Sequence, residues 1–233
     1  YGLIRIVGTL PEAAQIIQPL LLILALVGMI YGALLAWRQT DLKAMVAYAS
    51  VSHMGIVLLG IAVLNQNGIA GAVVQMTAHG LIAGALFLLI GLLYERTNTR
   101  HIQDYSALVQ VMPRFALFMT FTLLAAMGLP GSVGFIAELH TIIGGFQQWG
   151  WIMVFFSISI LITAAYVLRT LALLFTGPVI QGMDQVEDLR PNEMVAAGLL
   201  VLFIVGLGLM PAPLLDMSAS AISQVNSAFQ ETR

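Results

Sequence analysis

The sequence contains no cysteine and very little charge: of its 233 residues, 9% are Asp, Glu, Lys or Arg. Without cysteine, the chain has no disulfide framework, thiolate zinc site or cysteine-ligated iron–sulfur cluster. Soluble domains carry about 25% charged residues, so this composition excludes an ordinary soluble domain. The formal net charge of −2 provides no basic surface for nucleic acid.

The residues that are abundant are apolar, since they make up 60% of the chain and give a mean hydropathy of +0.96. A helix needs about 20 largely apolar residues to cross a bilayer core of ~30 Å. Six stretches meet this requirement and lack the alternation of barrel strands. We therefore predict an all-α integral membrane protein with about six transmembrane helices, the fourth of them discontinuous near residues 129–131. The predicted spans are Gln15–Trp37, Leu42–Leu64, Gly68–Tyr94, Arg114–Phe146, Trp151–Phe175 and Glu193–Met210.

The loops between these spans predict their orientation. Loops 65–67 and 147–150 carry no charge, whereas the loops on the opposite side are basic. The arginines of the basic loops are Arg38, Arg96, Arg100 and Arg190. By the positive-inside rule the basic side faces the cytoplasm or an equivalent compartment. The tail, residues 211–233, then lies on the outer side, where we expect a short helix on the membrane surface.

Glu138 is the strongest candidate for a functional residue. An ionisable side chain at the bilayer centre costs about 2.5–3.5 kcal/mol on insertion scales, so one that is kept there indicates function. Glu138 lies about eight residues before the next polar loop, roughly 12 Å below the surface at 1.5 Å per residue. A desolvated carboxyl group can exchange protons near neutral pH, and we predict a proton-transfer role. The alternative is a carboxylate that pairs with an arginine of a neighbouring subunit for packing.

The segment just before Glu138 is predicted to interrupt its helix. Pro130 removes a backbone donor, and Gly128, Gly131 and Gly134 permit non-helical dihedral angles. Freed backbone groups are tolerated at membrane depth where they line protein or a hydrated cavity. A discontinuous helix with an acid about two turns later is similar to the sites of ion-coupled transporters. The alternative is a plain proline kink.

Two histidines near mid-depth are candidates for a proton relay, because imidazole titrates near neutrality and can both accept and donate a proton. His53 is about eleven residues into the second span and shares a polar stripe of about 80° with Lys43 and Ser50. His79 is about twelve residues into the third span. Either histidine could instead be a hydrogen-bonded core residue, and Lys43 could extend to the cytoplasmic interface as a packing residue.

The remaining histidines are predicted to have no part in the relay. His140 is two residues from Glu138 and therefore on a different helix face, which favours packing or an interface, and His101 lies in a charged loop. No two histidines have the i, i+4 spacing of local metal ligands, so we predict no metal site. A glycine-rich phosphate loop and a Ser–His–Asp pattern are also absent from the sequence, and we predict no cofactor on this chain.

Several motifs occur together along the chain. They are Arg38–Lys43 (RQTDLK), Ala47–Gly55 (AYASVSHMG), Ala78–Leu81 (AHGL), Gly91–Arg96 (GLLYER) and Gly128–Gly131 (GLPG) followed by Gly134, Phe135 and Glu138. In combination, and over essentially the whole chain, they resemble the antiporter-like membrane subunits of proton-pumping NADH:quinone oxidoreductase, respiratory complex I. Most members have lysine at the position of Glu138, and glutamate there resembles the M-type (chain 4) members. Ala137 departs from the pattern, in which glycine commonly precedes the acid.

This resemblance implies a fold of fourteen helices with two inverted five-helix repeats, of which the chain resembles the second repeat plus the last helix. It also implies that Glu138, His79 and His53 belong to a central hydrophilic axis, with Lys43 near its cytoplasmic edge. The essential Glu and Lys of the first repeat would lie before Tyr1. The predicted divisions are residues 1–14, the end of a preceding helix and an outer-side loop; 15–175, the five-helix repeat; 176–210, a cytoplasmic loop and the last transmembrane helix; and 211–233, the outer tail.

The function implied is that of a proton-translocating subunit without its own redox centre, coupled to quinone reduction elsewhere in complex I. Its expected partners are protons, the lipid bilayer and other membrane-arm subunits, including neighbouring antiporter-like subunits, but not nucleic acid. The expected location is an energy-transducing membrane such as the bacterial inner membrane, with a periplasmic C-terminus. One alternative is a subunit of a multi-subunit sodium/proton antiporter or membrane-bound hydrogenase. Another is a structural subunit that only anchors partners.

Overall fold

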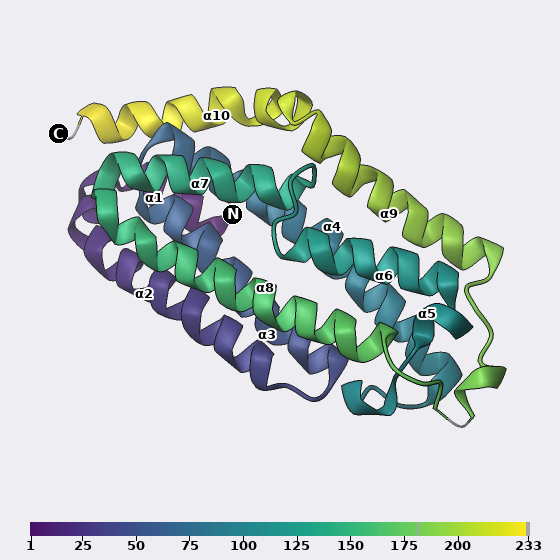
Figure 1. Ribbon diagram of the computed structural model, residues 1–233. Coiled ribbons are helices and arrows are strands. Elements are labelled where there is room, and N and C mark those ends of the chain that lie inside the picture. The colour runs from purple at the N-terminus through teal and green to yellow at the C-terminus, as the bar shows by residue number, and fades with distance from the viewer. Residues whose placement is uncertain (181, 232–233) are drawn as a thin grey trace.

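The computed structural model describes residues 1–180 and 182–231, which form an elongated bundle of helices (Figure 1). These residues contain no strand beyond one isolated bridge between Asp41 and His101. The helices are α1 (Gly2–Thr9), α2 (Pro11–Arg38), α3 (Leu42–Ala62), α4 (Gln66–Thr97), α5 (Leu108–Val111), α6 (Pro113–Ala126), α7 (Val133–Trp149), α8 (Val154–Phe175), α9 (Pro191–Leu209) and α10 (Ala212–Glu231). Three short 3₁₀ turns complete them: η1 (Ile102–Asp104), η2 (Gly150–Met153) and η3 (Met183–Gln185).

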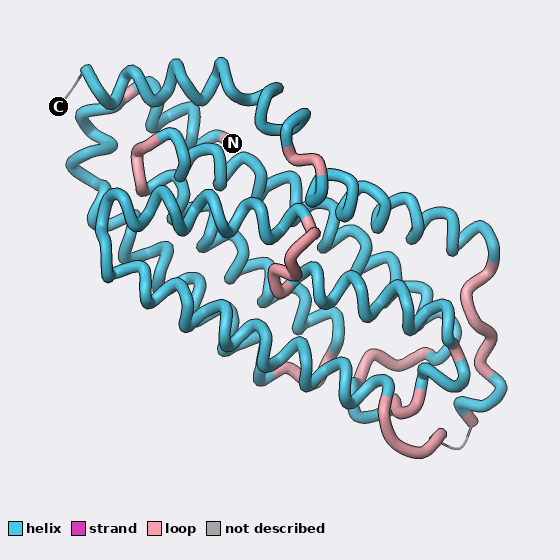
Figure 2. The backbone as a smooth tube through the Cα atoms, turned by 45° about the horizontal axis from the view of Figure 1, so that its top comes forward, coloured by secondary structure: helices cyan, strands magenta, loops and turns pink. Residues whose placement is uncertain are grey.

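Most of these helices are long and apolar enough to cross a membrane. Among the described residues, α2, α3, α4, α9 and the 43-residue run Val133–Phe175, which contains α7, η2 and α8, meet this criterion. Helix α6 is apolar but has only 14 residues, and Figure 2 shows a loop in the middle of the bundle between α6 and α7. Helices α6 and α7 therefore form the discontinuous helix that Pro130 and its neighbouring glycines predict.

Local chemistry accounts for the ends of the helices. The Asp41 side chain accepts a hydrogen bond from the Ala44 amide at 2.9 Å at the start of α3, and the Asn65 side chain caps α4 in the same way. Such capping satisfies amide groups that have no partner within the helix. Helix α2 begins at Pro11, four residues before the predicted Gln15, because proline is favoured in a first helical turn.

Close contact between α4 and α7 depends on glycine. A Cβ atom on Gly71 of α4 would lie only 2.4 Å from the Thr141 hydroxyl oxygen, and a Cβ atom on Gly144 of α7 would lie 2.6 Å from the Gly68 amide nitrogen. Small residues let transmembrane helices approach closely enough for backbone contact. This packing fixes α7, which carries Glu138, against α4, which carries His79.

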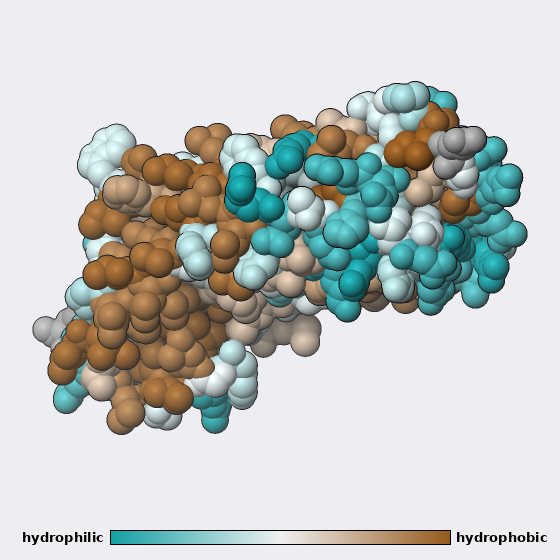
Figure 3. Space-filling model, turned by 90° about the horizontal axis from the view of Figure 1, so that it is seen from below, coloured by the Kyte–Doolittle hydropathy of each residue, from teal (hydrophilic) through white to brown (hydrophobic). Residues whose placement is uncertain are grey.

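The outer faces of the helices remain apolar. Leu117 on α6, Leu161 on α8 and Val195 on α9 are 68%, 69% and 72% exposed. Figure 3 shows a hydrophobic surface that extends over much of the bundle, with hydrophilic residues gathered toward the end that holds α5 and η1. An apolar surface of this extent on helices of this length fits a lipid environment.

The C-terminal segment forms a longer helix than predicted. Helix α10 has 20 residues and follows α9 along one side of the bundle (Figures 1 and 2). Its Ile222 and Phe229 join a buried apolar cluster with residues of α1, α3 and α4. Residues 212–231 of the tail are therefore helical and pack on this bundle, while the position of the tail at an outer membrane surface stays a prediction.

Arg96, near the end of α4, ties this helix to the start of α9. Its side chain is 11% exposed and pairs with Glu193, which is 12% exposed, and its Nε donates to the Glu187 carbonyl at 3.0 Å. This ion pair is partly buried, and removing one partner leaves the other charge without its counter-ion in a place that water reaches poorly. We expect Arg96→Met to lower the thermal unfolding temperature of the complete subunit in detergent by several degrees, measured by circular dichroism.

The matched control for this prediction is Arg190→Gln. Arg190 pairs with Glu187 at 3.3 Å, but the two side chains are 66% and 73% exposed. Exposed pairs contribute little to stability, so the control is expected to unfold close to the unmodified temperature. Equal shifts in the two variants would contradict a structural role for the Arg96–Glu193 pair.

Candidate functional site

The interruption between α6 and α7 is the centre of the site. Residues 127–132 lie outside both helices, and Gly128 and Gly131 have φ angles of +81° and +94°. Only glycine adopts this region without steric strain. Part of the backbone is bonded within the loop, since the Gly128 amide donates to the Ala125 carbonyl at 3.2 Å. The loop thus interrupts the helix while keeping several of its backbone groups paired.

His53 of α3 binds a carbonyl that this interruption makes available. Its Nε2 lies 3.1 Å from the carbonyl oxygen of Ala126, the last residue of α6. A carbonyl oxygen only accepts, so His53 Nε2 carries the hydrogen. The side chain is 6% exposed. His53 is therefore a buried imidazole whose orientation is fixed by the end of the broken helix.

The two predicted relay histidines contact each other directly. His53 Nδ1 and His79 Nδ1 are 3.2 Å apart, and the two rings are nearly perpendicular, with their centroids 5.3 Å apart. Because Nε2 of neutral His53 is the protonated nitrogen, its Nδ1 accepts and His79 Nδ1 donates. His79 Nε2 is then the nitrogen that can accept a proton. Hydrogen-bond contacts thus run without a break from His79 of α4 through His53 to the loop.

Glu138 also contacts this loop. It lies in the second turn of α7 and is 8% exposed, and its carboxyl group packs against Gly128, where a Cβ atom would lie 2.3 Å from Oε2. Within the described ranges, no Lys, Arg or His forms an ion pair with it. The acid therefore meets the loop two residues from the carbonyl that holds His53, and no direct hydrogen bond among described residues joins it to either histidine.

Two further buried polar atoms, Gln75 Oε1 and the Ser132 hydroxyl, have no hydrogen-bond partner among the described residues. Gln75 lies one helical turn before His79 on α4, and Ser132 is the residue before α7. Buried polar atoms of this kind are typically satisfied by ordered water. Ser132 therefore places a buried polar atom at the end of the loop.

Lys43 lies apart from the histidine pair. It is exposed in the first turn of α3 and lines a surface groove with Tyr94 and Arg100. Ser50, the other member of the predicted stripe, lines a narrow cavity with His53 and His79. The structure therefore brings together the histidines and Ser50, and places Lys43 at the basic end of the bundle, where its role stays a prediction.

The remaining histidines lie outside the site. His140 Nδ1 contacts the Ile136 carbonyl of its own helix at 2.9 Å, as a packing residue does, and His101 is exposed. In residues 1–180 and 182–231, no three His, Asp or Glu side chains are grouped so that they could hold a metal ion.

A row of hydroxyl groups on α8 is the feature that the sequence analysis missed. The members are buried and spaced at i, i+4, i+7 and i+11, so they share one helix face. They are Ser159, Thr163, Tyr166 and Thr170. Ser159 lies 3.4 Å from the Ser52 hydroxyl of α3. This spacing is visible in the sequence and would have identified the face.

Comparison with known proteins decides the family. The family model described as "NADH:quinone oxidoreductase/Mrp antiporter, TM" matches residues 1–163. The chain belongs to this family. It is 36% identical over 242 residues to NAD(P)H-quinone oxidoreductase chain 4 of Gloeobacter violaceus, a match that covers 99% of this chain and 46% of the relative. The chain thus spans about half the length of the curated relatives that it matches.

Solved structures agree with this membership in the NADH:quinone oxidoreductase/Mrp antiporter family. A chain of respiratory complex I from Thermus thermophilus has a TM-score of 0.88 and 34% identity, with 94% of this chain and 46% of that chain covered. A chain of the Mrp complex from Dietzia sp. has a TM-score of 0.82 and 20% identity, with 100% of this chain and 51% of that chain covered. At this identity the match supports a shared fold and nothing more. The predicted all-α, antiporter-like fold is confirmed, while the helix count and the inverted repeat stay predictions.

Proposed function

We propose that this chain is the carboxyl-terminal half of the M-type (chain 4) membrane subunit of a proton-pumping NADH:quinone oxidoreductase. The chain would hold no redox centre, and protons would pass through its buried ionisable residues when quinone is reduced elsewhere in the complex. The observation that carries this proposal is the 3.2 Å contact between His53 Nδ1 and His79 Nδ1. This contact joins two membrane-spanning helices beside a loop that also receives the carboxyl group of Glu138.

The hydrogen bonds of the pair define how one proton would cross it. His79 accepts a proton at Nε2 and donates its Nδ1 hydrogen to His53 Nδ1. His53 then releases its Nε2 hydrogen at the loop, beside the Ala126 carbonyl. Water would deliver the proton that forms the His79 Nε2–H bond and take up the proton that leaves His53 Nε2. Between the two rings, the His53 Nδ1–H bond forms as the His79 Nδ1–H bond breaks, and both imidazoles end neutral with exchanged tautomers. The path resets when the rings rotate or the tautomers exchange again.

Glu138 supplies the charge that responds to the rest of the complex. A buried carboxylate without a paired cation interacts strongly with distant charges, because the surrounding dielectric is low. Quinone reduction would change the electrostatic field along the membrane arm and thereby the proton affinity of Glu138. Glu138 would then take up or release a proton at the loop that His53 contacts. The Arg-rich end of the bundle would face the cytoplasm of a bacterial inner membrane, and the C-terminus would face the periplasm.

The partners follow from the same proposal. The chain would pack against other membrane-arm subunits, among them neighbouring antiporter-like subunits, within the lipid bilayer. Two kinds of observation support this: the matched solved chains belong to multi-subunit complexes, and large apolar side chains of this bundle are exposed.

The experiment uses inverted membrane vesicles from cells that carry the complete subunit within its complex. With NADH and a quinone, we expect the vesicle lumen to acidify in sodium-free buffer, and a pH-sensitive dye reports this. Vesicles from cells in which the gene for this subunit is deleted serve as the control and are expected not to acidify.

The family model also covers Mrp antiporters, so a sodium/proton antiporter is the second candidate. It predicts sodium-dependent proton movement across the vesicle membrane without NADH. That result, together with no NADH-driven acidification in sodium-free buffer, would contradict the complex I proposal.

A further inference from the structure

Helix α6 receives its cap from a distant part of the chain. Its N-cap residue is Met112, which makes no side-chain capping bond, and Pro113 has no backbone N–H. Arg114 and Phe115 carry the next two amides, which have no carbonyl partner within the helix. The Asp188 carboxylate accepts from both, through Oδ2 from the Arg114 amide at 2.9 Å and through Oδ1 from the Phe115 amide at 3.1 Å. One carboxylate from the segment before α9 thus holds the start of α6.

The segment that carries Asp188 is itself bonded to the end of α4. Arg96 Nε donates to the Glu187 carbonyl at 3.0 Å, and its Nη2 lies 3.4 Å from the carbonyl oxygen of Asp188. The Arg114 guanidinium adds a contact of 3.4 Å to the Leu189 carbonyl. The position of the Asp188 carboxylate is therefore set by α4 as well as by α6.

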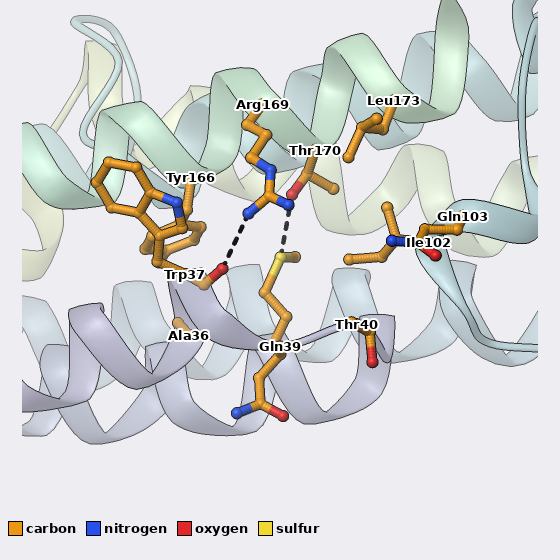
Figure 4. A pocket seen from close by; sticks show the side chains of 11 residues that line it. Ala36, Trp37, Gln39, Thr40, Ile102, Gln103, Tyr166, Arg169, Thr170 and Leu173 are labelled. Carbon is orange, nitrogen blue, oxygen red and sulfur yellow. Dashed lines mark hydrogen bonds between the residues drawn. The ribbon is translucent and has the colours of Figure 1, made fainter.

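Helix α8 is anchored at the same end of the bundle. Arg169 Nη1 donates to the Trp37 carbonyl of α2 at 3.2 Å, and the Thr170 hydroxyl donates to the sulfur of Met45 on α3 at 3.2 Å. Figure 4 shows Arg169 and Thr170 extending from α8 toward the end of α2, beside a cavity of about 20 Å³ that Tyr166 also lines. Side chains of α8 thus cross-link α2 and α3 here, and the basic end provides a fixed frame for the start of α6.

The opposite end of α6 is bonded to the histidine pair. Helix α6 has 14 residues, so roughly 20 Å of helix at 1.5 Å per residue separates its start from Ala126. The Ala126 carbonyl lies 3.1 Å from His53 Nε2, and His53 Nδ1 lies 3.2 Å from His79 Nδ1 of α4. The contacts form a closed ring that runs from the Asp188 carboxylate along α6 to the histidine pair and back along α4 to Arg96.

We propose that Asp188 is a positioning residue for the histidine pair, because it fixes how far α6 extends toward His53. The bond from His53 to the Ala126 carbonyl is 3.1 Å long, near the upper end of the usual range, so a small retreat of the carbonyl breaks it. The capping bonds of Asp188 resist this retreat, since the amides of the first turn move with the whole helix. This inference rests on the proposed function, because it assumes that protons pass through His53.

The first test compares three substitutions of Asp188 in the assembled complex. Asparagine keeps the side-chain length and an acceptor oxygen and caps helices about as well as aspartate, so we expect Asp188→Asn to pump within about threefold of the unmodified rate. Glutamate keeps the charge but carries its oxygens one CH₂ group further, and alanine removes both bonds. We expect Asp188→Glu and Asp188→Ala to pump about tenfold more slowly, because α6 shifts relative to His53. NADH-driven vesicle acidification, normalised to assembled complex, is the measurement.

The matched control is Glu187→Gln in the same segment. It removes a negative charge next to Asp188, but the Glu187 side chain is 73% exposed and pairs with Arg190 at 3.3 Å. The Glu187 backbone carbonyl, which Arg96 contacts, stays in place. The control is expected to pump at the unmodified rate, because an exposed ion pair contributes little.

Hydrogen–deuterium exchange in the detergent-solubilised complex provides a readout that a purely local cap does not move. Loss of the cap alone speeds exchange of the amides at the start of α6. If α6 transmits the change, the loop amides that bond to the end of α6 also exchange faster in Asp188→Ala, roughly 20 Å away. These are the amides of Gly128 and Leu129, which bond to the Ala125 and Leu124 carbonyls at 3.2 and 3.1 Å. Glu187→Gln is expected to change neither region.

The outcomes separate this inference from the proposed function. If Asp188→Glu and Asp188→Ala pump like Glu187→Gln, packing alone positions α6 and the inference is wrong. It is also wrong if Asp188→Asn pumps as slowly as Asp188→Ala, or if exchange rises only at the start of α6. In each case a Glu138→Gln complex that fails to pump leaves the proposed function standing. If Glu138→Gln also pumps normally, the proposed function itself fails.

Discussion

Replacing Glu138 by glutamine is expected to abolish proton translocation by the assembled complex, with a fall of about a hundredfold or more in vesicle acidification. Glutamine has nearly the same shape as the acid but carries no exchangeable carboxyl proton. Because Glu138 is 8% exposed and packs against the loop between α6 and α7, the substitution keeps the packing and removes only the titration. NADH-driven acidification, normalised to the amount of assembled complex, provides the measurement.

The matched control is Glu95→Gln, which makes the same chemical change on α4 at an exposed position. It is expected to pump normally, because a solvated carboxylate can be replaced at little cost. Coupled acidification that persists unchanged in Glu138→Gln would show that this acid does not conduct protons. If the double variant Glu138→Gln with His79→Ala also pumped normally, the chain would be an anchoring subunit, as the structural alternative predicts.

Gly128→Ala is expected to have the second-largest effect, because it disturbs the loop and the acid together. Gly128 has a φ angle of +81°, where a side chain costs about 1–2 kcal/mol. Its added Cβ atom would also lie 2.3 Å from Glu138 Oε2 and 3.1 Å from the carboxyl carbon. The carboxyl group must therefore move away from the loop. We expect the variant complex to assemble at reduced yield, and each assembled complex to pump at least about tenfold more slowly.

Gly131→Ala separates these two effects. Gly131 has a similar φ angle of +94°, but the nearest atom to an added Cβ is Leu209 Cδ2 at 3.8 Å, an ordinary contact. The two variants therefore carry a similar backbone strain, and only one displaces Glu138. Thermal unfolding of the complete subunit should show comparable losses of stability, while the pumping rate per complex should fall only in Gly128→Ala. An equal loss of pumping in both would show that strain in the loop, rather than contact with the acid, is responsible.

Much of the fold follows from the sequence because a bilayer imposes strong rules. Long apolar runs must be helical in lipid, which explains why α3, predicted as Leu42–Leu64, is observed as Leu42–Ala62. The interruption of the fourth span follows from Pro130 between Gly128 and Gly131. In each case the residues that determine the structure lie within one segment of the chain.

The contacts of the site depend on packing that no single segment determines. The sequence places His53 and His79 at mid-depth, but their 3.2 Å contact depends on how α3 and α4 rotate against each other. Close approach at Gly60 and Gly68, where an added Cβ would overlap backbone atoms, fixes that rotation. Helix periodicity alone predicted that Lys43 and His53 share one polar stripe. Periodicity gives the face on which a residue lies, but not whether that part of the face is covered, and Lys43 is exposed.

Tyr166 escaped the sequence analysis for a chemical reason. Serine, threonine and tyrosine carry no charge, so in a membrane helix they lack the strong insertion cost that makes Glu138 conspicuous. Their spacing identifies a common face on α8, but it does not show which other elements that face meets. The cavity beside Tyr166 involves residues from α2, α3, η1 and α8, and a combination of that kind requires the folded chain.

The hydrogen bond between His53 Nε2 and the Ala126 carbonyl is 3.1 Å long. It links the tautomer of the His53 imidazole to the position of the end of α6. A carbonyl accepts hydrogen from only one tautomer of the ring. If the end of α6 withdrew by about the length of one bond, this tether would be lost and His53 could turn to a different neighbour. Under the proposed function, displacement of the end of α6 would therefore release the imidazole from this tautomer and control whether a proton crosses the histidine pair.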